Sequence, residues 1–208
     1  MKNKDIEYRS FTIQVDDNIQ DTRTITGLAI PVESKSQLLG GKFYEVISRN
    51  AVDENLILKN DVRLLYNHEP GFGSLGRSKY GEGSLRLYVE DDGLHFETEL
   101  PRTNFGDTIL EGLRRKEIDS CSFGFIVGKN HFDKNEDGTY NRSIESFNKL
   151  IEISLLDVAP AYLDTDVAMR SIDEIEEAEK SLEEQKKQEI LDELKSKREE
   201  FNSLCEDK

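Results

Sequence analysis

The stretch from Ser171 to about Leu204 contains neither proline nor glycine, and this feature limits what the rest of the chain can fold into. Its composition favours a helix. Residues 171–208 carry 14 acidic and 7 basic side chains, a net charge of −7 out of −15 for the 208-residue chain. A helix so highly charged buries little surface. We therefore expect a globular domain at residues 1–170 and an acidic helical tail at 171–208.

The apolar residues of the tail form two short stripes that are out of register with each other. One interpretation is a helix that binds a scaffold or associates with a second copy of itself. The alternative is a solvated helical extension, because runs of charge are usually solvated faces. The stripes consist of Ile172, Ile175 and Leu182, and of Ile190, Leu191, Leu194, Phe201 and Leu204.

Residues 1–170 contain many β-patterns and few helical ones. The clearest pattern is a hairpin, in which residues 85–90 and 94–100 alternate between apolar and polar side chains around the turn Asp91-Asp92-Gly93. Helices are expected at 50–59, with Asn50 as N-cap, and from Thr103 or Asn104 to Lys116. These patterns predict an α+β fold with a partly closed antiparallel β-barrel core, a few packed helices and a charged C-terminal helix. Further strands are expected at 6–15 and 22–30, joined by a turn at 16–18, and at 42–47, 62–66, 118–127 and 150–158.

The net charge and the cysteine content exclude several classes of protein. Nucleic-acid binding needs clustered Lys and Arg, which an acidic chain of this kind lacks. Two cysteines, Cys121 and Cys205, provide no disulfide framework and favour a reducing compartment. The first residues show no apolar signal core, and no run approaches the roughly 18 apolar residues of a membrane span. We expect a cytoplasmic protein with no signal peptide and no membrane or nucleic-acid partner.

Three separated stretches carry residues suited to nucleophilic catalysis. His68 follows the apolar run 62–66, and Ser120 and Ser122 lie on one face of a predicted strand with Cys121 on the other. Glu152 interrupts the apolar strand 150–156. A histidine, a serine and a carboxylate at the ends of buried strands are the components of a serine hydrolase.

The residues alone leave some of these roles open. Either serine is a candidate nucleophile, and Glu152 is satisfied equally by a histidine or by an arginine such as Arg63 or Arg77. His95 and His131 lie on polar segments and are interpreted as surface residues. Residues 71–76 match G-x-G-x-x-G without a following helix, and residues 133–138 begin like a calcium loop that lacks its twelfth-position Glu. We therefore predict no cofactor and no metal, and a hairpin turn at Asp137-Gly138.

Seven short segments, taken in order and spacing, resemble the prohead maturation proteases of tailed phages of the HK97 type. The resemblance extends from about Thr24 to Asp166. The segments are 27–31 (GLAIP), 43–47 (FYEVI), 65–68 (LYNH), 75–76 (LG), 92–94 (DGL), 122–125 (SFGF) and 152–155 (EISL) followed by 159–161 (APA).

The resemblance implies roles for three residues. The Asn-His pair of the family corresponds to His68, the serine before Phe-Gly-Phe to Ser122, and the acidic third member to Glu152. It also implies a fold similar to the herpesvirus assemblins. The implied function is a serine endopeptidase that cleaves scaffold and/or the scaffold-like N-terminal part of the major capsid protein, and often itself, inside the immature capsid in the host cytoplasm. The alternative function is a non-enzymatic capsid assembly factor, and the acidic tail has no counterpart in the resemblance.

Overall fold

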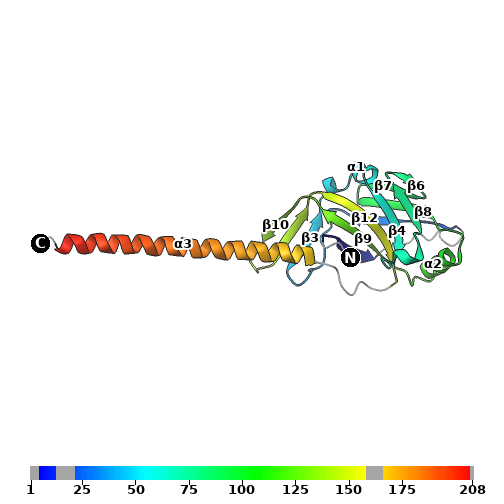
Figure 1. The fold of residues 1–208 in the computed structure, drawn as a ribbon. Coiled ribbons are helices and arrows are strands. Elements are labelled where there is room, and N and C mark those ends of the chain that lie inside the picture. Colours follow the sequence, from blue (N-terminus) through cyan, green and yellow to red (C-terminus); the bar gives the residue numbers. More distant parts are fainter. Residues whose placement is uncertain (1–4, 13–21, 158–165, 207–208) are drawn as a thin grey trace. The chain divides into compact units, whose positions relative to one another are not determined.

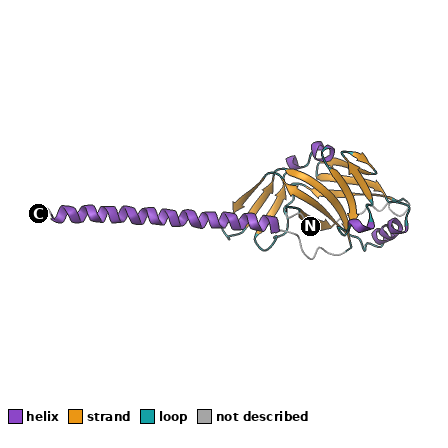
Figure 2. Ribbon diagram, viewed as in Figure 1, coloured by secondary structure: helices purple, strands orange, loops and turns teal. Residues whose placement is uncertain are grey.

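The computed structural model describes residues 5–12, 22–157 and 166–206. The chain divides into two compact units, Met1–Val167 and Ala168–Lys208. Strands dominate the first unit, and a single helix, α3 (Asp166–Glu206), makes up nearly all of the second (Figures 1 and 2).

The largest sheet of the first unit contains six strands. In Figure 1 the strands β9, β12 and β4 lie side by side at its centre. Most neighbours are antiparallel, but β4 and β12 run parallel. The order across the sheet is β1 (Glu7–Thr12), β9 (Ser120–Val127), β12 (Phe147–Leu156), β4 (Asp61–Tyr66), β5 (Gly76–Lys79) and β6 (Glu82–Gly83).

Two three-stranded sheets complete the first unit. One has the order β10 (Asn130–Lys134), β11 (Tyr140–Ile144) and β3 (Phe43–Ile47), with β11 and β3 parallel. The other has the order β2 (Thr24–Pro31), β8 (Gly93–Glu99) and β7 (Leu85–Glu90), and contains the predicted hairpin. The α+β class is confirmed. The partly closed antiparallel barrel is not, because none of the three described sheets closes on itself and two strand pairs are parallel.

The helices of the first unit are short, and one predicted cap is wrong. Residues 50–59 form a 3₁₀ turn, η2 (Arg49–Ala51), and a separate helix, α1 (Glu54–Leu58). Asp53 rather than Asn50 caps α1, since its carboxylate accepts the Leu56 backbone N–H at 2.9 Å. Thr103 caps α2 (Asn104–Arg114) as predicted, accepting the Gly106 N–H at 3.1 Å. A further 3₁₀ turn is η3 (Pro70–Phe72).

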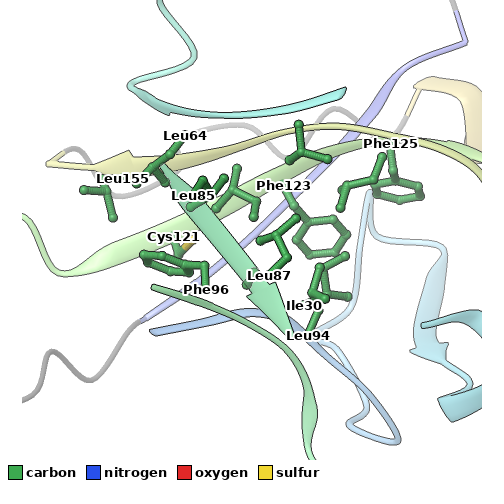
Figure 3. Close-up of a cluster of buried hydrophobic side chains, with 14 of the residues drawn as sticks. Ile30, Leu64, Leu85, Leu87, Leu94, Phe96, Cys121, Phe123, Phe125 and Leu155 are labelled. Atoms are coloured by element: carbon green, nitrogen blue, oxygen red, sulfur yellow. The ribbon is translucent and has the colours of Figure 1, made fainter. Parts of the chain in front are cut away.

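The apolar face of β9 packs into the core of the first unit (Figure 3). Cys121, Phe123 and Phe125 lie on this face, beside Ile30, Leu94 and other side chains of the β2-β8-β7 sheet. Because strand residues alternate between faces, Ser120, Ser122 and Gly124 lie on the opposite face. Burial raises the pKa of the Cys121 thiol to about 12, so the buried cysteine is a neutral core residue at ordinary pH.

A buried network of four charged side chains ties β1 to the β10-β11-β3 sheet. Arg9 donates to Glu7 at 2.6 Å and to Glu45 at 2.7 Å. Arg142 donates to the same two carboxylates, at 2.6 and 2.9 Å. Two arginines balance two glutamates, so the buried charges compensate one another.

Some predictions fall on other parts of the chain. The turn expected at Asp137-Gly138 is present between β10 and β11, and Gly138 has a φ of 84°. The strands β5, β6, β10 and β11 were not predicted. The turn at 16–18, residues 159–161, and the side chains of Phe201, Leu204 and Cys205 lie outside the described residues. A search of the described helices finds none that is long and apolar enough to cross a membrane.

Candidate active site

The face of the central sheet that points away from the core carries two adjacent rows of polar side chains. Strand pairing defines the rows, since residues directly opposite one another on neighbouring strands point to the same face. We call this surface the site face. Its rows are Tyr8–Gly124–Glu152 and Ser10–Ser122–Ser154, each running from β1 through β9 to β12.

His68 reaches the site face through a sharp change of backbone direction. Asn67 and His68 have φ values of 50° and 60°, so two consecutive residues adopt the left-handed conformation directly after β4. Strand β4 ends beside Leu155 of β12. The imidazole Nδ1 of His68 nevertheless lies 2.5 Å from Oε1 of Glu152, which precedes Leu155 by three residues on β12. The histidine side chain therefore turns back over the sheet, across the level of the Ser122 row.

Asp157, the residue just after β12, stabilises the turn that orients His68. Asp157 accepts hydrogen bonds from the Asn67 amide, at 2.8 Å, and from the Tyr66 hydroxyl. The Asn67 backbone N–H donates to the Leu155 carbonyl at 2.9 Å. The hydrogen bonds from Tyr66 and Asn67 lower the pKa of Asp157, while burial and the Asp157 hydrogen bond raise the pKa of Tyr66 to about 12. Asp157 thus stays ionised and fixes the strained pair of residues in place.

Tyr8 and Gly124 shape the surroundings of the imidazole. The Tyr8 ring meets the His68 ring edge to face, with centroids 4.7 Å apart and planes at 70°. A Cβ atom on Gly124 would lie 2.7 Å from the Tyr8 ring and 3.1 Å from Glu152 Cγ. Only glycine at position 124 lets Tyr8 and Glu152 pack over β9.

Glu152 is 8% exposed and has two polar partners on the site face. Its Oε1 contacts His68 and also accepts the Ser154 hydroxyl at 3.3 Å. When Glu152 is ionised, Nδ1 of His68 is the donor in this contact, which leaves Nε2 as the basic nitrogen. Among the described residues, Nε2 has no hydrogen-bond partner and is available for proton transfer.

Ser122 lies in the row next to Glu152. Along β12 this row falls between Leu155, where β4 ends, and Glu152, which His68 contacts. Ser122 is 1% exposed, and within the described part of the chain its hydroxyl makes no hydrogen bond with His68. Ser120 lies one row further from Glu152, and its hydroxyl donates to Asp119 at 2.8 Å. The strand register thus favours Ser122 over Ser120 as the serine from which His68 would accept a proton.

Neither of the two arginines considered as partners of Glu152 forms an ion pair with its carboxylate. Arg63 is its neighbour on β4 but is exposed, and Arg77 pairs with Asp61. In the described residues the one ion pair of Glu152 is with His68. The structure therefore brings together His68 and Glu152, and places Ser122 on the same face. The sequence missed Tyr8 and Asp157, whereas the two-residue spacing of Glu152 and Ser154 was visible in it.

One group of residues elsewhere has donors suitable for a metal ion. Glu90, Asp92 and His95 at the β7-β8 turn have ligand atoms within 4.8 Å of one another. His95 Nε2 is bonded to Asp92 at 2.6 Å, and both carboxylates are exposed. This group lies on the hairpin, away from the residues of the site face, and the chemistry of His68 does not involve it.

A histidine that contacts a buried carboxylate, with a serine on the same face, defines a candidate serine hydrolase. The family of caudovirus prohead serine proteases matches residues 4–181, and the chain belongs to this family. The protein is therefore a serine protease of capsid maturation. Family membership favours the enzyme over the non-enzymatic assembly factor.

Comparison with solved structures finds the capsid assembly protease gp21 of bacteriophage T4. The two share 10% sequence identity at a TM-score of 0.47, over 74% of this chain and 98% of the T4 chain. No curated protein matches the sequence.

Proposed function

We propose that this protease uses Ser122 as nucleophile, His68 as general base and acid, and Glu152 as the group that orients the imidazole. The 2.5 Å contact between His68 Nδ1 and Glu152 supports this assignment, since it directs the basic Nε2 away from the carboxylate. Ser122 lies on the same face of the sheet, in the row next to Glu152.

The proposed reaction is hydrolysis of a peptide bond through an acyl-enzyme. Ser122 Oγ attacks the carbonyl carbon while its proton passes to His68 Nε2. The carboxylate of Glu152 stabilises the imidazolium that forms, and His68 then returns the proton to the leaving amine. Water and the same histidine release the acyl group in the second half of the reaction.

The proposed substrates are the scaffold and/or the scaffold-like N-terminal part of the major capsid protein. The cleavage would take place inside the immature capsid, and the protease would also cleave itself. Membership in the prohead serine protease family supports this proposal, because a prohead is an immature capsid.

The test is intact mass spectrometry over time of the purified protein, alone and mixed with its capsid and scaffold precursors. The wild type should release defined fragments, and Ser122→Ala should release none. Ser120→Ala is the matched control, because Ser120 lies on the same strand and face and is two residues away. Ser120→Ala should cleave like the wild type. Equal cleavage by the wild type and Ser122→Ala, or loss of cleavage only in Ser120→Ala, would reject the assignment.

A further inference from the structure

The first strand, β1, faces the candidate nucleophile with a serine of its own. Ser10 on β1 is the direct pairing partner of Ser122 on β9. Resting on the proposed function, we propose that the Ser10 hydroxyl is a second catalytic group, which donates a hydrogen bond to the oxyanion formed when Ser122 attacks a peptide carbonyl.

The Ser10 hydroxyl is buried and, among the residues that the structure describes, has no hydrogen-bond partner. In the described part of the chain, three buried side-chain atoms lack a hydrogen bond, namely the hydroxyl oxygens of Ser10, Ser78 and Tyr140. A buried donor without an acceptor destabilises the folded state, so such groups are uncommon unless they act on something that arrives later. An oxyanion is an acceptor that exists only during the reaction.

The position of Ser10 suits this task. Directly paired residues on antiparallel strands have Cβ atoms roughly 4.5–5.5 Å apart. An oxyanion on a carbon bonded to Ser122 Oγ therefore comes within hydrogen-bond reach of Ser10 Oγ. Ser154, the partner of Ser122 on the other side, donates instead to Glu152. Of the two serines that flank Ser122, only Ser10 keeps its donor for substrate.

Acylation of Ser122 needs no reactant other than the peptide and the side chains of Ser122, His68 and Ser10. The bond between Ser122 Oγ and the carbonyl carbon forms, the π electron pair of the carbonyl moves onto its oxygen, and the Ser122 proton moves to His68. Ser10 keeps its proton and shares it with the charged oxygen. When the intermediate collapses, the C–N bond breaks and the amine takes the proton from His68.

The test uses a fluorophosphonate probe, which reacts with an activated serine, loses fluoride and leaves a neutral tetrahedral phosphonyl ester whose polarised phosphoryl oxygen accepts hydrogen bonds. The full-length protein is treated, and the rate of adduct formation at Ser122 is followed by mass spectrometry. Ser10→Ala should react about 10²-fold more slowly, the loss typical of one oxyanion donor. Ser10→Thr keeps a hydroxyl and should recover much of the rate.

Ser78→Ala is the matched control, since Ser78 also has a buried hydroxyl without a partner but lies on β5. Both alanine variants should unfold at a temperature equal to or above that of the wild type, because each removes an unsatisfied donor. Ser78→Ala should react at the wild-type rate. A purely structural role for Ser10 predicts the opposite, namely slower reaction in step with a lower unfolding temperature.

The outcomes separate this inference from the proposed function. A wild-type adduct at Ser122 with an equal rate in Ser10→Ala overturns the role of Ser10 alone. No adduct at Ser122 in the wild type, or an adduct that persists in Ser122→Ala, counts against Ser122 as nucleophile and against both proposals. A slow Ser10→Ala with normal stability supports the role of Ser10.

Discussion

At the scale of single residues, the contact between His68 and Glu152 predicts that peptide cleavage depends on the charge of Glu152. Replacing Glu152 by Gln keeps the size of the side chain but removes the charge that stabilises an imidazolium, and its amide can hold the wrong tautomer of His68. We expect the rate of peptide cleavage to fall by roughly 10²–10⁴ with the fold unchanged. Cleavage is measured by mass spectrometry and the fold by the unfolding temperature. Exposed Glu145→Gln serves as control, and full activity of Glu152→Gln removes Glu152 from the site.

The residues of the site differ in how well the sequence predicts them. His68 and Glu152 stand out locally, because each is an ionisable residue placed in or just after an apolar run. Tyr8 is 60 positions away from His68, and only the pairing of β1 with β9 brings the two rings together. Asp157 looks like an ordinary loop residue until the turn at Asn67 is seen. Contacts that depend on strand pairing leave no local pattern in the sequence.

At the scale of elements, β1 serves two purposes through the alternation of its side chains. Tyr8 and Ser10 point to the site face, whereas Glu7 and Arg9 enter the buried charge network with Arg142. Loss of the network should therefore loosen the strand that carries Tyr8 and Ser10.

Glu7→Gln tests the network. Glu7 is fully buried, so removing its charge leaves Arg142 and Arg9 poorly compensated, and the free energy of unfolding should fall by roughly 3–5 kcal/mol at pH 7. Burial raises the pKa of Glu7, but hydrogen bonds and charges from Arg142 and Arg9 outweigh burial and hold the pKa below 4.5. A lowered folded-state pKa gives stability that is present above pH 4.5 and is lost as the pH falls through the folded pKa.

The difference in stability between wild type and Glu7→Gln should therefore shrink as the pH falls from 4.5 through the folded pKa, since Glu7 takes up its proton first in the unfolded chain and then in the native protein. Chemical denaturation of both proteins from pH 7 to acid measures this directly. A difference that stays constant over the whole range would show that the charge of Glu7 is not what stabilises the fold.

Elements defined by local signals are the ones that the sequence predicts well. The 85–100 hairpin needs only alternation and a turn, and the Thr103 cap needs only its neighbours. The parallel pairing of β4 with β12 joins residues about 90 positions apart, and no turn motif or hydrophobic periodicity in the sequence predicts it. The expected antiparallel barrel failed for that reason: strand patterns reveal that strands exist, not which strands pair.

At the scale of the whole molecule, the acidic helix extends beyond the family match. The match ends at residue 181, whereas α3 continues to Glu206. Leu182, Ile190 and Leu194 on this helix are each more than half exposed. A helix with exposed apolar positions and many charges is suited to pairing with another helix, such as one from a scaffold protein.

Deleting residues 182–208 should therefore prevent incorporation of the protease into procapsids while peptide cleavage in solution stays at the wild-type rate. The deletion begins where the family match ends, at residue 181, so the matched part of the chain stays intact. A full-length variant with Leu182, Ile190 and Leu194 replaced by Ser removes the apolar stripe without shortening the chain, and should also fail to enter. Incorporation is measured by quantifying the protease in purified procapsids. Normal packaging of both variants would mean that the helix is a solvated extension and that the first unit alone recruits the enzyme.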